Sequence, residues 1–372
     1  YGDWLALDRA GAVANSVYGA TDEAYIADIY YAASARIVAK AAAVLGLEET
    51  RQNYQAIADR QWQVVKEEYF TATGRCAVKT QTGLVLALKY HLSDNERLTE
   101  QMLRKLLRDN KNKLNTGFVG TPLLCNVLTE HGMTDLAYRL LLNEEYPGWL
   151  HEVKLGATTV WERWNSLDEN GRISSTGMNS LNHYSYGAVL EWIFRHVAGI
   201  DVTEQGPGGK MMRISPKVDH KLGSASAVYD SASGCYRCGW QIENGDQITV
   251  TVTVPFGAKA QVILPYAPDS VYHDTDNPLF ETVENGICCV KAGQYTVTYK
   301  AASPLKKSYS VDSTLEDLLA EPAIRAFLSN MMEVDMIPDL AYGLTLRQAA
   351  EAFAGGVSAE QAQRLNVLLE EF

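Results

Sequence analysis

Residues 146–187 bring together most of the side chains in this chain that could carry out chemistry. Trp161 and Trp164 flank a carboxylate, Glu162, and a guanidinium, Arg163. Aromatic faces stack on the C–H surfaces of sugars, and a carboxylate between them can orient hydroxyl groups or take a proton from water. The aromatic and ionisable residues of the stretch are Trp149, His151, Glu152, Trp161, Glu162, Arg163, Trp164, Asp168, His183, Tyr184 and Tyr186. The pattern fits a carbohydrate site, and it fits an amphipathic loop with ordinary buried tryptophans equally well.

Hydrophobic periodicity indicates which elements position this stretch. Apolar residues recur with a period close to 3.6 over about 21–200, which predicts packed helices, including one at about 180–197. The period changes to two over about 210–300, and residues 247–254 form the clearest predicted strand. Short strands separated by turn residues predict an antiparallel β-sandwich. The helical period returns from about 312.

These changes of period divide the chain into three predicted domains. We expect a helical domain at 1–203, a β-sandwich at 204–305 and a small helical appendage at 312–372. Polar loops on a helical scaffold are common places for functional sites, so the cluster at 146–187 is expected on loops of the first domain.

Composition and charge exclude several classes of protein. The chain has 372 residues, with 33 Lys and Arg against 45 Asp and Glu, so its formal net charge is −12. That balance lacks the positive surface of a nucleic-acid-binding protein, and no apolar run approaches the roughly 20 residues that span a bilayer. We therefore expect neither nucleic acid nor membrane as a partner, and the cytoplasm is the favoured location.

Two pairs of cysteines raise the question of a metal site. Cys235 and Cys238 lie on a predicted strand, where this spacing points them to opposite faces. Cys288 and Cys289 are adjacent rather than spaced like zinc ligands. We therefore expect no metal, no required disulfide and no cofactor.

Four motifs follow one another in the helical region. They are 117–122 (GFVGTP), 146–149 (YPGW), 156–164 (GATTVWERW) and 179–184 (NSLNHY). Together they resemble the bacterial α-L-rhamnosidases of glycoside hydrolase family 78. Gly2-Asp3-Trp4 matches the Gly-Asp-Trp element of that family, and the resemblance extends over about residues 1–303.

The resemblance implies a fold, a reaction and a set of site residues. The fold would be an (α/α)₆ barrel followed by a β-sandwich, and the reaction would be the inverting hydrolysis of terminal α-L-rhamnose from rhamnosides. Glu162 would be the general base that activates water, with Arg163 or another donor beside it to keep it ionised. The residues implied to contact the sugar are Trp4, Asp3, Trp161 and His183.

One part of the family pattern is not found in this chain. The general acid of the family lies in a segment that precedes the Gly-Asp-Trp element, whereas here that element stands at residues 2–4. We therefore expect this chain to be a C-terminal part that holds the base half of the site and is inactive alone. An incomplete barrel also predicts an exposed apolar patch and self-association.

Two other interpretations fit the same residues. The chain could belong to another (α/α)₆ enzyme, such as a different inverting exo-glycosidase or an unsaturated glucuronyl hydrolase. It could also be a carbohydrate-binding or scaffold protein without catalysis. Release of rhamnose from a rhamnoside distinguishes the leading hypothesis from both.

Overall fold

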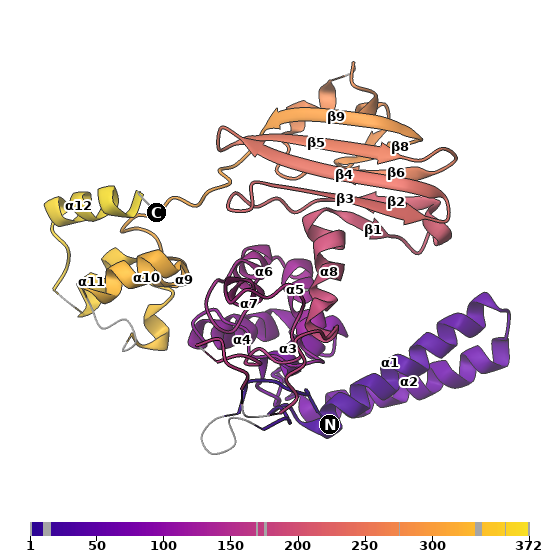
Figure 1. Cartoon of the computed structure of the whole chain (residues 1–372), viewed down its shortest axis with the longest axis horizontal. Helices are drawn as coiled ribbons and strands as arrows, with labels where there is room; N and C mark the ends of the chain where they lie inside the picture. Colours follow the sequence, from indigo (N-terminus) through magenta and orange to yellow (C-terminus); the bar gives the residue numbers. More distant parts are fainter. Residues whose placement is uncertain are drawn as a thin grey trace. The chain divides into compact units, whose positions relative to one another are not determined.

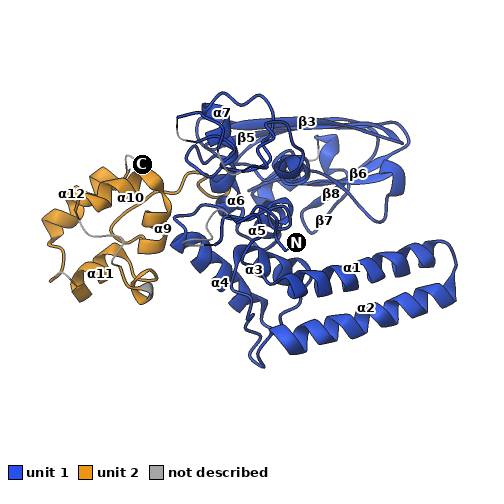
Figure 2. Ribbon diagram, turned by 60° about the horizontal axis from the view of Figure 1, so that its bottom comes forward, with its two compact units in different colours: residues 1–300 blue, residues 301–372 orange. Residues whose placement is uncertain are grey.

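The computed structural model divides the chain into two compact units, residues 1–300 and 301–372 (Figure 2). The residues that it describes are 2–9, 16–168, 170–174, 177–274, 276–331, 337–353 and 355–370.

The first unit begins with two long antiparallel helices that form a hairpin, α1 (Glu23–Val44) and α2 (Glu48–Tyr69) (Figure 1). The Asp22 side chain caps α1 by accepting from the Tyr25 amide at 2.8 Å. Gly46 ends the helix with φ of 72°, a left-handed conformation that glycine adopts without strain. Apolar side chains near the tip of the hairpin, among them Val44 and Leu45, are exposed.

Shorter helices follow the hairpin and carry much of the helical core. Several of them are buried on more than one face, as expected of helices packed in layers. They are α3 (Gln81–Lys89), α4 (Glu96–Asp109), α5 (Thr121–Glu130), α6 (Thr134–Leu141), α7 (Trp149–Lys154) and α8 (Val189–Trp192).

The predicted helix at about 180–197 differs from the structure at its start. Residues before Ser185 are not helical, a 3₁₀ turn covers Ser185–Ala188, and a π-helical turn at Ile193–Val197 follows α8. The physical reason is that 180–183 makes backbone hydrogen bonds with another loop, described below, instead of with its own next turn. Helix α7, by contrast, lies in a stretch expected to be loop.

The β region consists of two sheets. One has the strand order β3-β4-β5-β9 and is antiparallel throughout, and the other has the order β1-β2-β6-β8-β7 with a single parallel pair, β2–β6. In β5, burial alternates residue by residue, as period two predicts. The strands are β1 (Ile200–Val202), β2 (Met211–Ile214), β3 (Ser224–Ser231), β4 (Gly234–Glu243), β5 (Gln247–Val254), β6 (Lys259–Ile263), β7 (Val283–Glu284), β8 (Ile287–Val290) and β9 (Gly293–Lys300).

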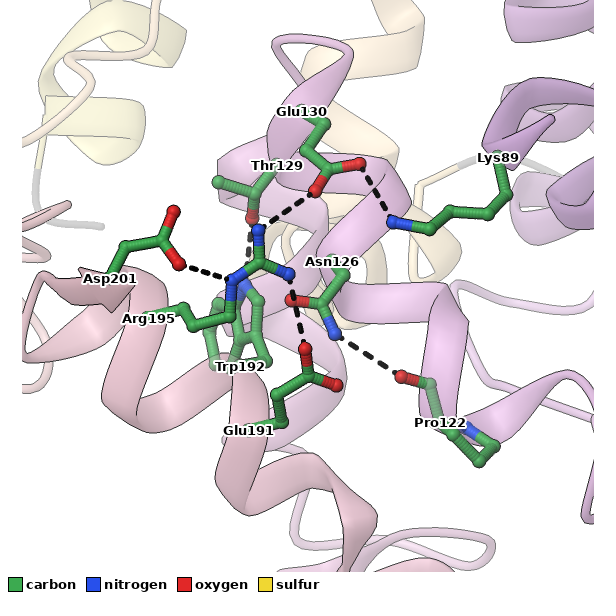
Figure 3. Close-up of polar contacts among 9 residues, drawn as sticks. All are labelled: Lys89, Pro122, Asn126, Thr129, Glu130, Glu191, Trp192, Arg195 and Asp201. Atoms are coloured by element: carbon green, nitrogen blue, oxygen red, sulfur yellow. Dashed lines mark hydrogen bonds and ion pairs between the residues drawn. The ribbon is translucent and has the colours of Figure 1, made fainter. Parts of the chain in front are cut away.

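Polar side chains join α5, α8 and β1 where the helical region meets the sheets (Figure 3). Arg195 lies at the centre, with Nε 2.9 Å from Asp201 and Nη1 3.1 Å from Glu191. Its Nη2 also lies 3.5 Å from Glu130 at the end of α5. A planar guanidinium with several partners fixes their relative orientation better than a single contact would.

Two further hydrogen bonds cross the same boundary. The buried Trp240 indole on β4 donates to the Val197 carbonyl at 2.7 Å, and the Tyr138 hydroxyl on α6 donates to the Lys217 carbonyl. Each satisfies a polar atom of a large apolar side chain. The sheets are therefore tied to the helices that carry the candidate site.

The second unit has a hydrophobic core of its own. Its capping box is reciprocal: Ser358 Oγ accepts from the Gln361 amide at 3.2 Å, and Gln361 Oε1 accepts from the Ser358 amide at 2.9 Å. Its helices are α9 (Leu315–Ala320), α10 (Pro322–Ser329), α11 (Leu346–Phe353) and α12 (Ala359–Glu370). Its core includes Val311, Leu315, Leu318, Leu319, Ile324, Leu328, Leu346 and Leu369.

Among the described residues, no helix combines the length and the apolar character that crossing a membrane requires.

Candidate active site

Two loop segments pair with each other and carry Glu162 and His183. The Glu162 amide donates to the Ser180 carbonyl at 2.9 Å, and the His183 amide donates to the Val160 carbonyl at 2.8 Å. The Thr159 hydroxyl adds a bond to the Leu181 carbonyl. This antiparallel pairing brings together two residues that lie 21 positions apart.

The Glu162 carboxylate is half-buried and has a fixed donor. The Ser180 amide donates to its Oε2 at 3.0 Å, from the same segment that pairs with its backbone. Arg163, the donor expected first, is buried and directs its Nη1 to the Gly177 carbonyl at 3.4 Å. The donor beside Glu162 is therefore a backbone amide.

Phe118, which the sequence analysis did not select, links Trp4 with His183. The Phe118 ring stacks on the His183 ring with centroids 5.3 Å apart, and its amide donates to the Trp4 carbonyl at 2.9 Å. The ring also meets Tyr186 edge-on at 5.5 Å. Its position inside the GFVGTP motif was the sequence feature that could have identified it. Trp4, Phe118, His183 and Glu162 thus belong to one connected set of contacts.

Asp3 directly precedes Trp4 in the chain, and its side chain is fully buried. Its Oδ2 accepts from the Thr82 hydroxyl at 2.5 Å and the Gly117 amide at 2.8 Å. Its Oδ1 accepts from the amides of Val119 at 2.7 Å and Gly120 at 3.2 Å. Burial raises the pKa of Asp3 from its ordinary value, and the four donors oppose that rise. Asp3 was expected to contact the sugar, whereas the structure surrounds its carboxyl with protein donors.

A close backbone approach accompanies the Asp3 bonds. A Cβ at Gly117 would meet the Trp4 carbonyl oxygen at 2.1 Å and the Ala6 nitrogen at 2.6 Å. Both are far below contact distance, so only glycine fits. The first described residues and the 117–120 loop are thereby held in close backbone contact.

The tryptophans of the motif pack mainly against protein. Trp164 stacks on Tyr186 with centroids 4.1 Å apart, and its indole donates to the Thr116 carbonyl at 3.1 Å. Trp149 meets Trp164 edge-on at 5.3 Å. Trp161, expected to help form an apolar wall, is only 2% exposed. Trp4 is the half-buried tryptophan of the set and meets Tyr18 edge-on at 5.4 Å.

Glu152 on α7 is a buried carboxyl for which the sequence analysis assigned no role. It is 3% exposed, and its Oε2 accepts from the Trp161 amide at 3.4 Å. Burial raises the pKa of Glu152 to about 8, opposed by that single bond. Its membership of the aromatic cluster could have drawn attention to it, but its burial depends on tertiary packing.

No group of three or more His, Cys, Asp and Glu side chains that could hold a metal ion occurs within the described ranges. All six cysteines are free thiols. On β4, Cys238 faces the buried side together with Tyr236 and Trp240, while Cys235 lies on the other face, as strand alternation predicts.

Comparisons with known protein families match both regions of the first unit. The bacterial alpha-L-rhamnosidase 6 hairpin glycosidase domain matches residues 1–197, and the bacterial alpha-L-rhamnosidase C-terminal domain matches residues 199–277. Two curated relatives are alpha-L-rhamnosidases of Formosa agariphila and an Alteromonas species. The chain is 36% identical to each, over 72% and 79% of its own length and 29% and 32% of theirs.

Solved structures give the same result. The alpha-L-rhamnosidase of Streptomyces avermitilis complexed with L-rhamnose matches with a TM-score of 0.69 and 31% identity, over 81% of this chain and 28% of that one. The alpha-L-rhamnosidase of Aspergillus terreus matches with a TM-score of 0.70 and 27% identity, over 82% and 33%. The chain spans about a third of the length of these relatives. These matches confirm the predicted fold class, part of an (α/α)₆ barrel followed by a β-sandwich, and the chain belongs to the bacterial α-L-rhamnosidase family.

Proposed function

We propose that this chain carries the general-base half of an inverting α-L-rhamnosidase site, and that Glu162 is the base. The observation that carries this proposal is the geometry of Glu162. Its carboxylate is half-buried, receives the Ser180 amide, and stands on a segment bonded to the segment of His183. The amide contact fixes the orientation of the carboxylate, and a carboxylate positioned in this way can accept a proton from water.

In the proposed reaction, Glu162 takes a proton from a water molecule, and the water oxygen attacks the anomeric carbon of rhamnose. The bond from that carbon to the leaving oxygen breaks on the opposite face, and an acid protonates the leaving oxygen. One proton is accepted and one is donated, so the two carboxyl groups exchange their protonation states. We assign no acid among the described residues.

The proposed substrate is a terminal α-L-rhamnoside, whose sugar has C6 as a methyl group. Trp4 and the stacked rings of Phe118 and His183 offer apolar faces, which suit the C–H surface of such a sugar. The His183 Nδ1 accepts from the Ser185 amide at 3.3 Å, which favours the tautomer that carries its proton on Nε2. That N–H is the group we propose to bind a sugar hydroxyl.

The test is the Glu162→Gln variant in the longest open reading frame that encodes this chain. Glutamine keeps the shape and the Ser180 contact but cannot accept the proton, so kcat on a natural rhamnoside should fall by at least about a hundredfold. The matched control is Glu243→Gln, an exposed residue on β4. Activity of Glu162→Gln within a few-fold of the parent would refute the assignment, and release of another sugar would support a different exo-glycosidase.

A further inference from the structure

Glu152 holds both ends of the turn that leads to Glu162. Its backbone carbonyl accepts from the Leu155 amide at 3.1 Å and the Ala157 amide at 3.0 Å. Its side-chain Oε2 accepts from the Trp161 amide at 3.4 Å. The residue on which Glu152 acts is therefore the direct neighbour of the proposed base.

The surroundings of the Glu152 carboxyl favour its neutral form. Among the described residues, its buried Oε1 has no hydrogen-bond partner, and Oε2 has a single amide donor. A buried carboxylate needs several donors or a cation to offset the loss of water, whereas a neutral carboxyl needs fewer. The rise of its pKa to about 8, caused by burial, agrees with this geometry.

Several titratable and charged groups stand around Glu152. Tyr186, in the 3₁₀ turn, interacts electrostatically with Glu152, and the same tyrosine also interacts with Asp3, Tyr146 and Arg163. On α7 itself, His151 meets the Tyr146 ring at 5.7 Å, and Lys154 pairs with Glu144. The cluster thus contains one buried cation, Arg163, whose Nη1 is directed to a carbonyl oxygen.

We propose that Glu152 is a positioning residue: in its neutral form it holds the Trp161 amide and so fixes the backbone that presents Glu162, and its ionisation loosens that backbone. This inference rests on the proposed function of Glu162. Loss of the Glu152 proton leaves a buried charge with a single amide donor, so the carboxylate is drawn toward water and away from the Trp161 amide. A displacement of about 1 Å at a catalytic group costs on the order of a hundredfold in rate, so activity falls on the alkaline side.

The first experiment measures kcat and KM on p-nitrophenyl α-L-rhamnopyranoside from about pH 5 to about pH 10. It uses the longest open reading frame that encodes this chain and the variants Glu152→Gln and Glu152→Leu. Glutamine retains the acceptor for Trp161 and cannot ionise, so the alkaline fall in kcat should disappear. Leucine removes the acceptor, so kcat should fall by about tenfold at every pH with little change in KM. The control is Glu144→Gln, which removes an exposed carboxyl that pairs with α7 and should leave the parent profile unchanged.

A second measurement does not need activity. Hydrogen exchange of the peptide that spans 157–162 should be faster in Glu152→Leu than in the parent at pH 6, and Glu152→Gln should restore the slow exchange. Parent-like exchange in Glu152→Leu, or an alkaline limb that persists in Glu152→Gln, would overturn the proposal. If the parent hydrolyses no rhamnoside, the proposed function fails, and the exchange data still decide whether Glu152 holds this segment.

Discussion

Asp3 and Glu152 are both buried carboxyls beside the proposed site, but the hydrogen bonds around them differ. Asp3 receives four donors from α3 and the 117–120 loop, with each oxygen accepting two. Glu152 receives one amide at 3.4 Å and leaves its other oxygen without a partner among the described residues. The surroundings of Asp3 therefore fit an acceptor, and those of Glu152 fit a neutral acid.

The difference shows that burial alone does not decide what a carboxyl does. Burial raises the pKa of both groups, and only at Asp3 do several donors oppose the rise. Asp3 joins segments of the chain through its four hydrogen bonds, while the protonation of Glu152 changes with pH near neutrality. The same chemical change, from acid to amide, should therefore have opposite effects at the two positions.

Asp3→Asn should cause the largest loss of stability among these variants. The amide keeps one acceptor oxygen but turns an N–H₂ group toward donors, which leaves about two buried donors without partners. Each costs about 1–3 kcal/mol, so the free energy of unfolding should fall by about 4 kcal/mol. Urea unfolding followed by circular dichroism measures it. Asp8→Asn is the control, because the Asp8 side chain accepts from the Ala20 amide at 2.7 Å and is less buried, and equal losses would contradict the comparison.

Glu152→Gln should raise the free energy of unfolding, and only at high pH. Burial raises the pKa of this carboxyl from its ordinary value of 4.5 to about 8, so the folded state binds more protons than the unfolded state between these values. Stability from this group is complete below about pH 4.5 and is lost as the pH rises to about 8. At about pH 9 the variant should be more stable than the parent by roughly 3 to 5 kcal/mol, an advantage absent at about pH 5. Melting curves across this range test it, and a pH-independent difference would exclude the mechanism.

Thr82→Val should change stability less than Asp3→Asn or Glu152→Gln. It removes one of the four donors to Asp3 and keeps the shape of the side chain, so about 1–2 kcal/mol of stability should be lost. Thr82→Ser keeps the hydroxyl and should recover most of it. If valine costs as much as Asp3→Asn, the four donors do not share the stabilisation of the carboxylate.

Glu144→Gln should have almost no effect on stability. Glu144 is 58% exposed and pairs with Lys154 on the same helix as Glu152. Exposed ion pairs contribute about 0–1 kcal/mol because water and salt screen them. A shift in the pH profile of stability as large as that of Glu152→Gln would show that α7 as a whole, and not the buried carboxyl, is responsible.

Much of the fold could be predicted because its pattern is local. The strand predicted at 247–254 is β5, and the long helices α1 and α2 lie in the region where a period close to 3.6 predicts helices. The predicted helix at 180–197 was wrong at its start because residues 180–183 pair with 160–162. Such a pairing joins residues that are distant in the sequence, so local periodicity cannot predict it.

The sequence motifs indicate which residues are candidates for the site, but not the contacts that these residues make. The motif identifies Asp3, but a motif does not tell which way a side chain points, and here the carboxyl faces the 117–120 amides. Phe118 and Glu152 gain their contacts from loops that meet only in the folded chain. The roles proposed for Glu162, His183, Trp4 and Trp161 stay predictions until the variants are measured.

Because tryptophans cluster around the candidate site, their fluorescence can be used to follow changes there. Four of the seven tryptophans, Trp4, Trp149, Trp161 and Trp164, belong to the set of residues described there, and residues 301–372 contain none. Indole emission responds to polarity and to stacked partners, so tryptophan fluorescence reports on the first unit alone. Under the proposed function, a titration with L-rhamnose should give a binding curve without a label, even for the Glu162→Gln variant with its lowered kcat.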